Sequence, residues 1–262
     1  MYETLEILRD GGVATVWMNR PEVHNAFNAQ LIADLTAAFR ALDADDGVRV
    51  VVLAGRGKSF SAGADLNWMK AAGAASVVDN LADARKLAGM LRVIAEMTKP
   101  TIARVHGAAL GGGMGLASAC DICVAGDKAV FATSEVRFGI IPSAISPYVL
   151  RAIGERQAYR YFQTAERISA ARAVELGLAH ELAEGDALDA KVAEIVGALL
   201  QGGPKSQAAA KALIRAVANR PVADAVVEDT ARRIAELRAT PEAREGLDAF
   251  LGKRPAGWVP GG

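Results

Sequence analysis

The chain has 262 residues, of which 52% are hydrophobic, so it can bury a large core as one domain or as one domain with an appendage. Thirty basic side chains balance thirty acidic ones, which argues against nucleic acid or an anionic membrane as the main partner. No apolar run reaches transmembrane length, and the first residues lack the pattern of a signal peptide. We therefore expect a cytoplasmic protein with no nucleic-acid and no membrane partner.

The cysteines and histidines do not predict a metal or redox site. Cys120 and Cys123 form the sequence C-D-I-C, whose spacing matches half of such a site, but no second Cys or His pair lies nearby. The flanking residues are typical of a strand, which predicts that the two thiols are reduced, buried and on opposite sides of that strand. The three histidines, His24, His106 and His180, are too scattered to suggest metal ligands.

Short strands and helices alternate over the first half of the chain. Two alternating runs joined by Asp10-Gly11-Gly12 predict a β-hairpin. The predicted strands are 2–8, 13–19, 48–53, 101–105, 121–125 and 130–132. The predicted helices run over 28–42, from about 65, and over 76–97, with Asn28 as the N-cap of the first. Such alternation predicts an α/β fold.

The second half is predicted to be helical. The expected helices are 147–164, 169–177, 186–201, 204–219 and 222–251. The turn Gln201-Gly202-Gly203-Pro204 is the best domain boundary, which divides the chain into a core of residues 1–201 and a helical segment of residues 202–262. That segment has too little core of its own, so we expect it to pack on its own body or on another subunit.

Two loops of small residues could carry chemistry. They span 59–66 and 109–115, each at the carboxyl end of a strand and the start of a helix, where α/β proteins bind ligands. Neither matches a phosphate-binding or dinucleotide-binding fingerprint. The second contains three consecutive glycines, Gly111 to Gly113, which open the helix and let the main chain approach a ligand. Two N–H groups, one per loop, could form an oxyanion hole. The alternative is a tight turn that packs a helix on a strand, and these residues do not decide between the two.

Glu135 is the best candidate for an acid or base beside these loops. It lies in A-T-S-E-V-R-F-G-I-I-P, and its apolar surroundings predict a raised pKa that suits proton transfer near neutral pH. Arg137 is the only obvious ion partner, so the alternative interpretation is an exposed Glu135–Arg137 pair. No Ser–His–Asp arrangement is evident.

Five blocks in order carry a resemblance over nearly the whole chain. They are N-R-P-x-x-x-N-A-F-N (19–28), S-A-G-A-D-L (61–66), H-G-A-A-L-G-G-G-M-G-L (106–116), S-E-V-R-F-G-I-I-P (134–142) and A-F-L-x-K-R (249–254). Together they resemble the crotonase (enoyl-CoA hydratase/isomerase) superfamily. The resemblance implies a spiral of ββα units with a helical C-terminal trimerisation segment, assembled as a homotrimer or homohexamer.

The resemblance also assigns roles to residues. The backbone N–H groups of Ala64 and Gly112 would hold the thioester oxygen of an acyl-CoA as it becomes an enolate, and Glu135 would move the proton. Coenzyme A would be part of the substrate, so no separate cofactor and no metal are implied.

Further residues of the resemblance concern the coenzyme A chain. Those implied to line the pantetheine and adenine path are Ala26, Ala62, Asp65 and Leu66. Phe250 and Lys253 would reach the nucleotide end, which a neighbouring subunit could present, although Phe250 could equally serve helix packing. Arg56 or Lys58 could meet a phosphate, but a solvated loop charge is the simpler interpretation.

The sequence departs from the pattern at Gly115. Well-studied hydratases carry a first glutamate there, so a mechanism in which two carboxylates hold the attacking water cannot operate as written. Relatives with a single glutamate include Δ3,Δ2-enoyl-CoA isomerases. The runs I-S-P-Y-V (145–149) and A-I-G-E-R (152–156) most resemble bacterial hydratases of branched, carboxylated substrates such as 3-methylglutaconyl-CoA, in leucine breakdown. The distal carboxylate of such a substrate could occupy part of the space that Gly115 leaves.

The sequence therefore supports three functional hypotheses. The first is reversible hydration of the 2,3-double bond of an acyl-CoA, with Glu135 as the acid–base group. The second is double-bond isomerisation by the same glutamate. The third, of another class, is a non-catalytic acyl-CoA-binding protein.

Overall fold

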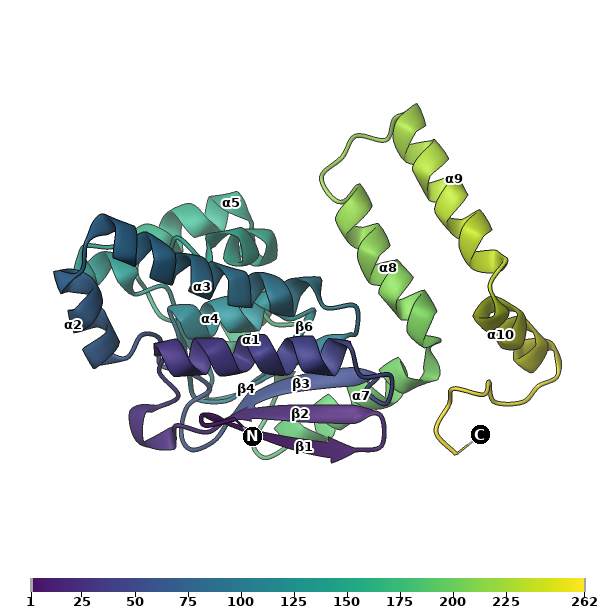
Figure 1. Cartoon of the computed structure of the whole chain (residues 1–262), viewed down its shortest axis with the longest axis horizontal. Coiled ribbons are helices and arrows are strands. Elements are labelled where there is room, and N and C mark those ends of the chain that lie inside the picture. The colour runs from purple at the N-terminus through teal and green to yellow at the C-terminus, as the bar shows by residue number, and fades with distance from the viewer. Residues whose placement is uncertain (1, 262) are drawn as a thin grey trace.

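The computed structural model describes residues 2–261, which form a mixed α/β body with a helical extension (Figure 1). The main sheet has the strand order β1-β2-β3-β4-β6-β9. Its strands are β1 (Leu5–Asp10), β2 (Val13–Met18), β3 (Val50–Gly55), β4 (Thr101–Val105), β6 (Ile122–Gly126) and β9 (Glu181–Ala183). β1 and β2 form the predicted antiparallel hairpin, and every later neighbour in this sheet pairs in parallel.

A second, smaller sheet has the order β5-β7-β8. Its strands are β5 (Ala108–Leu110), β7 (Val130–Ala132) and β8 (Ile168–Ser169). β5 follows β4 after Gly107, whose φ of +58° turns the chain from one sheet into the other. β5 and β8 are not among the strands that the sequence predicts, and the glycine loop was expected directly after β4, because strands this short carry almost no periodic signal.

The helices fall into two groups. Those of the body are α1 (Ala29–Asp43), α2 (Leu66–Ala74), α3 (Val77–Glu96), α4 (Gly112–Ala119), α5 (Ser146–Thr164), α6 (Ala170–Glu175) and α7 (Leu188–Gln201), with short 3-10 turns η1 (Pro21–Val23) and η2 (Glu135–Phe138). Those of the extension are α8 (Pro204–Val217), α9 (Asp224–Arg238) and α10 (Pro241–Leu251). Asn28 caps α1 as predicted, since its side chain accepts a hydrogen bond from the Leu31 N–H at 2.8 Å.

Both faces of the main sheet are covered, which explains the unbroken apolar run of β3. Val51 and Leu53 belong to the large core under α1, α3 and α4, whereas Val50 and Val52 pack with Leu188 of α7 on the other face. Alternate residues of a strand point to opposite faces, so a strand buried on both sides must be apolar throughout. Figure 1 shows α1, α3 and α4 together on one side of the sheet.

One helix prediction is wrong. The segment 222–251 is not one helix but two, because the chain breaks before Pro241. Proline has no N–H and disfavours helical geometry in the residue before it, so Pro241 starts a new helix, and the Thr240 side chain caps it by accepting from the Ala243 N–H. The sequence T-P-E contained this signal.

The extension projects away from the body (Figure 1) and buries few of its side chains against it. The apolar residues that it leaves exposed are Ile214, Val222, Val227, Ile234, Leu247, Phe250 and Leu251. These exposures agree with the expectation that the extension has too little core of its own. The domain boundary between residues 201 and 202 stays a prediction. No helix within residues 2–261 combines the length and the apolarity needed to cross a membrane.

Polar contacts tie α8 to the body. Lys211 Nζ lies 2.7 Å from Asp121 Oδ2, and the Arg215 guanidinium donates to the Ala95 carbonyl at 2.9 Å. Asp121 also accepts from the backbone N–H and the hydroxyl of Thr101. The lysine side chain is 12% exposed, so its charge is partly desolvated, and burial lowers its pKa even though Asp121 opposes that shift.

We expect Lys211→Ala to destabilise the protein by about 2–4 kcal/mol, because it leaves the Asp121 carboxylate in a partly buried place without its cation. Chemical denaturation measures this loss. The exposed Lys205 on the same helix provides the control, and Lys205→Ala should leave the free energy of unfolding within about 0.5 kcal/mol of the unmodified protein. Equal effects of the two substitutions would contradict this account of the contact.

Candidate active site

The two loops of small residues lie against each other. The Ser61 N–H donates to the Ala108 carbonyl and the Leu110 N–H donates to the Ser61 carbonyl, both at 2.9 Å. A Cβ atom on Gly63 would stand 3.1 Å from the Leu110 carbonyl oxygen, and Gly63 has a φ of +93°. Only glycine adopts this conformation without strain and allows this approach. The pairing therefore fixes the position of one loop on the other.

The Ala64 amide is oriented by its neighbours. The Phe27 N–H donates to the Gly63 carbonyl at 2.6 Å, and the Asp65 N–H donates to the Phe27 carbonyl at 2.9 Å. Because successive N–H groups of an extended segment alternate in direction, the N–H of Ala64 points away from Phe27. It is available to a group outside this pairing.

The Gly112 amide is the first of helix α4. The opening N–H groups of a helix have no partner within the helix and carry a partial positive charge. A Cβ atom on Gly112 would lie 2.5 Å from Cε2 of Phe27, so the ring excludes every larger residue. Phe27, 1% exposed, thus contacts both loops through its backbone and its ring. The sequence alone predicts no role for Phe27, although this residue lies in the block N-A-F-N.

Glu135 brings its carboxyl group to the glycine loop. It begins η2, directly after β7, and Gly111 is tied to β7 by a hydrogen bond from its N–H to the Ala132 carbonyl at 2.8 Å. Oε1 of Glu135 stands 3.1 Å from the place of a Cβ on Gly111, whose φ is +50°. The three predicted catalytic residues Ala64, Gly112 and Glu135 therefore belong to adjoining segments.

The environment of Glu135 suits proton transfer. Burial raises the pKa of its carboxyl group above the ordinary value of 4.5. Oε2 is buried, and within residues 2–261 no hydrogen-bond partner reaches it. Arg137 is exposed, and the described part of the chain contains no ion pair between it and Glu135. The alternative of an exposed Glu135–Arg137 pair is therefore wrong.

The residues assigned to the coenzyme A path fall into two sets. Those near the first loop are Ala26, Ala62, Asp65 and Leu66. Asp65 caps α2 and pairs with Arg20 at 3.1 Å, while Leu66 is 75% exposed beside it. The second set, Phe250 and Lys253, lies at the end of α10 in the extension, away from the loops of the same chain (Figure 1).

The basic residue proposed for a phosphate has other partners. The Arg56 guanidinium pairs with Glu6 at 2.7 Å and lies 3.9 Å from the centre of the Trp17 ring. A cation held on both sides has little freedom to bind a ligand. Lys58 is exposed, as expected of a solvated loop charge.

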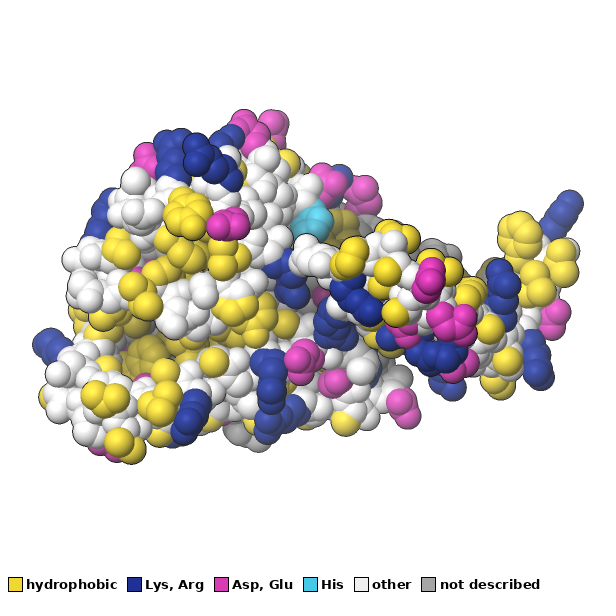
Figure 2. Space-filling view, turned by 90° about the horizontal axis from the view of Figure 1, so that it is seen from above, with side chains coloured by type: hydrophobic (Ala, Val, Ile, Leu, Met, Phe, Trp, Pro, Cys, Tyr) yellow, Lys and Arg dark blue, Asp and Glu magenta, His cyan; other side chains and the backbone are white. Residues whose placement is uncertain are grey.

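Apolar side chains surround the approach to the site. Leu66 is the last residue of the first loop. Phe138, Ile140 and Ile141 follow Glu135, and all four side chains are more than half exposed. On the face formed by α2, α3 and α5, Figure 2 shows hydrophobic side chains clustered around a hollow. Such a surface can accept an apolar chain.

The space beside Gly115 is not open. A Cβ atom on this residue would lie 2.2 Å from Cγ2 of Ile145. The expectation that a substrate carboxylate enters this space is therefore wrong, because an aliphatic side chain of the protein already fills it.

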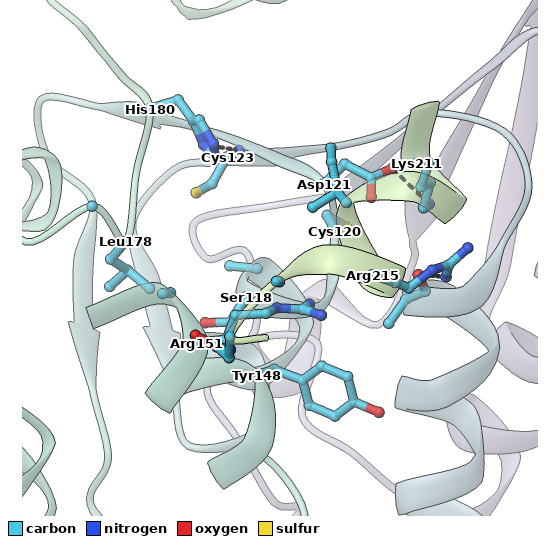
Figure 3. Close-up of a pocket in the computed structure, with 17 residues that line it drawn as sticks. Ser118, Cys120, Asp121, Cys123, Tyr148, Arg151, Leu178, His180, Lys211 and Arg215 are labelled. Atoms are coloured by element: carbon cyan, nitrogen blue, oxygen red, sulfur yellow. Dashed lines mark hydrogen bonds and ion pairs between the residues drawn. The ribbon is translucent and has the colours of Figure 1, made fainter. Parts of the chain in front are cut away.

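A cavity of about 470 Å³ lies between the body and α8, away from the candidate site (Figure 3). None of Ala64, Gly112 or Glu135 lines it. Cys120 and Cys123 both do, and burial raises the pKa of the Cys123 thiol to about 12 and that of Cys120 further. Thiols of such high pKa are unreactive, as predicted for packing residues. The expectation that they flank one strand is wrong, because Cys120 ends α4 and precedes β6.

Comparison with known proteins identifies the class. Residues 9–260 match the family model described as enoyl-CoA hydratase/isomerase. The chain is 33% identical to a crotonyl-CoA hydratase of Syntrophomonas wolfei, over 98% of both chains. The crystal structure of an enoyl-CoA hydratase from Shewanella pealeana superposes with a TM-score of 0.95 at 39% identity, covering 98% of this chain and 97% of that one. The structure of Pseudomonas aeruginosa AtuE superposes with a TM-score of 0.94 at 35% identity, and the match covers 98% of this chain and 100% of that one.

The chain therefore belongs to the enoyl-CoA hydratase/isomerase family and has the crotonase fold. Within the residues described, no group of three or more His, Cys, Asp or Glu side chains could hold a metal ion.

The raised pKa of Glu135 predicts a pH-dependent stability. The folded protein holds this proton more tightly than the unfolded chain, so ionisation of the carboxyl costs stability above its raised pKa and costs nothing below 4.5. Glu135→Gln should therefore raise the Tm by roughly 2 °C or more at pH 8 and leave it unchanged at pH 4. Thermal unfolding at both pH values measures this difference, and an increase of the same size at pH 4 would refute the burial argument.

Proposed function

We propose that the protein is an enoyl-CoA hydratase that adds water reversibly across the 2,3-double bond of an acyl-CoA. The observation that carries this proposal is a buried carboxyl group, Glu135, beside two paired loops that present the amides of Ala64 and Gly112. The family of the chain, and the crotonyl-CoA hydratase among its relatives, support the same activity.

The geometry suggests a simple mechanism. The amides of Ala64 and Gly112 hold the thioester oxygen, which becomes an enolate oxygen when a nucleophile adds at C3. Ionised Glu135 takes a proton from water as the hydroxide oxygen bonds to C3, and then delivers that proton to C2. The enolate collapses to the thioester, so the product gains one water molecule. A single carboxyl group that serves both carbons produces syn addition.

For the acyl group, we propose a branched, carboxylated substrate such as 3-methylglutaconyl-CoA. The runs of residues 145–149 and 152–156 support this choice. Because Ile145 fills the space beside Gly115, the distal carboxylate must bind elsewhere in the site. The free, buried cysteines agree with a cytoplasmic, reducing location for such an enzyme.

The one-carboxylate site also favours a second candidate, Δ3,Δ2-enoyl-CoA isomerisation. In that reaction Glu135 moves a proton from C2 to C4, and no water is added. A non-catalytic acyl-CoA-binding protein is the third candidate. The retained Glu135 argues against it, because a buried carboxyl group without a partner costs stability and such groups cluster at functional sites.

Parallel assays with crotonyl-CoA, 3-methylglutaconyl-CoA and a 3-enoyl-CoA separate these candidates. We expect hydration to be fastest with 3-methylglutaconyl-CoA, and Glu135→Gln to lower kcat by about 10²–10⁴-fold. Loss of the ultraviolet absorbance of the conjugated thioester measures the rate. Exposed Glu184 provides the matched control, and Glu184→Gln should retain full activity.

Faster conversion of the 3-enoyl substrate would instead favour the isomerase. Tight acyl-CoA binding without turnover of any of the three substrates would establish the binding protein. A folded Glu135→Gln variant with full hydratase activity would exclude Glu135 as the proton carrier.

We also propose that the chain assembles as a homotrimer or homohexamer through α8, α9 and α10. The extension exposes apolar side chains on each of its helices, including Ile214, Val227 and Phe250, and a second copy would remove them from water. In such an assembly Phe250 and Lys253 could approach the site of a neighbour. Light scattering should give three or six times the mass of the chain, and a monomer at micromolar concentration would contradict this proposal.

A further inference from the structure

The side chain of Ile145 packs directly against Gly115. Gly115 lies in the buried helix α4, and its N–H donates to the Gly111 carbonyl at 3.1 Å. The place of a Cβ atom on Gly115 is 2.2 Å from Cγ2 and 2.8 Å from Cβ of Ile145. Carbon atoms that are not bonded make their best contact at about 3.5–4.0 Å, so even one methyl group at position 115 would overlap the isoleucine.

Ile145 has little freedom to move aside. It is 3% exposed, within the large core, and it is the residue that precedes α5. Its carbonyl accepts from the N–H groups of Tyr148 and Val149, both at 3.1 Å, which fixes its backbone to the first turn of the helix. As a β-branched residue it also has restricted side-chain rotation.

This contact differs from those of the other glycines in α4. A Cβ on Gly112 would meet the Phe27 ring, and one on Gly113 would lie 2.3 Å from the Ser61 carbonyl oxygen. Ser61 belongs to the first loop and Phe27 pairs with that loop, so these two contacts position the paired loops. The neighbour of Gly115 is instead one aliphatic side chain, from the residue that precedes α5, which a smaller residue would remove.

The contact also lies close to the acid–base group. The hydrogen bond from Gly115 to Gly111 spans one helical turn, about 5.4 Å along the axis. Gly111 is the residue whose Cβ position lies 3.1 Å from Oε1 of Glu135. A carboxyl group on residue 115 would therefore stand within one turn of Glu135, where two carboxyl groups could bind the same water molecule.

We propose that Ile145 is a specificity-determining residue that excludes a second acid–base side chain from the site. It occupies the side-chain position of residue 115, leaves Glu135 as the single carboxyl group and presents an aliphatic wall in place of a polar one. The kinetic part of this inference rests on the proposed function, whereas its steric part does not.

A cycle of thermal unfolding tests the steric part. Gly115→Ala should lower the Tm by about 5 °C or more in the unmodified protein. In the Ile145→Gly background the same added methyl group should raise the Tm, because it fills part of the cavity left by isoleucine. Gly113→Ala is the control, since its clash with the Ser61 carbonyl should persist in both backgrounds. Ile145→Val retains both branches at Cβ and should not relieve Gly115→Ala.

Equal losses for Gly115→Ala in the two backgrounds would overturn the inference. So would a Gly115→Glu variant that unfolds at the temperature of the unmodified protein. If a singly substituted variant fails to fold, the double variant Gly115→Ala/Ile145→Gly is measured instead. A folded double variant supports the steric contact between the two residues, and an unfolded one refutes it. None of these measurements requires activity, so they stand if the proposed hydratase function fails.

Kinetics test the chemical part. Hydration of crotonyl-CoA by Gly115→Glu/Ile145→Gly should be at least about tenfold faster than by Ile145→Gly alone, and its pH–rate profile should gain a second ionisation. Gly115→Gln/Ile145→Gly has the same shape without the charge and should gain neither. A doubly substituted protein that is folded, and whose rate and profile match those of the glutamine control, would overturn the role of Ile145 in the chemistry.

Discussion

The pairing of Ser61 with Ala108 and Leu110 is the contact on which the site depends. It joins a loop after β3 to the short strand after β4, and it holds Gly63 against the Leu110 carbonyl so closely that a side chain there would clash. Phe27 completes the arrangement by pairing with the first loop and packing its ring on Gly112. The two amides proposed for the oxyanion are thus positioned by main-chain hydrogen bonds and by the ring of Phe27.

The small second sheet positions Glu135, the proposed acid–base residue, beside these loops. β5 pairs with β7, the Gly111 N–H bonds to Ala132, and the chain then turns into η2 at Glu135. The carboxyl group consequently lies beside Gly111, at the start of the glycine loop. Among the residues described, Oε2 of Glu135 is buried without a hydrogen-bond partner, which costs stability at the candidate site. Ile145, from the start of α5, closes the position where a second carboxyl group would otherwise stand.

Much of this site could be predicted from the sequence because its components are local. Three glycines at a helix start, a loop of small residues after a strand, and a glutamate among apolar residues each carry a signal within about ten residues. The helix break at Thr240-Pro241 has an equally local signal, the proline itself. The helical apolar pattern that continues across residues 222–251 nevertheless led to the prediction of a single helix. Strands β5, β8 and β9 carried no such signal, because segments of two or three residues are stabilised by their partners and show no period.

The sequence by itself determined the α/β class and the family, and it supplied Glu135 and the two loops as candidates for the site, because these follow from residue types at fixed spacing along the chain. Only the tertiary structure decided what adjoins them. Three contacts show this: Phe27 with Gly112, Arg56 with Glu6, and Ile145 with Gly115. Each joins segments roughly 30 to 85 residues apart in the chain. Such contacts depend on the sheet register and on the direction of each side chain. A glycine in the sequence therefore does not imply an empty space in the folded protein. At Gly115 the position of the missing side chain is filled by the side chain of Ile145.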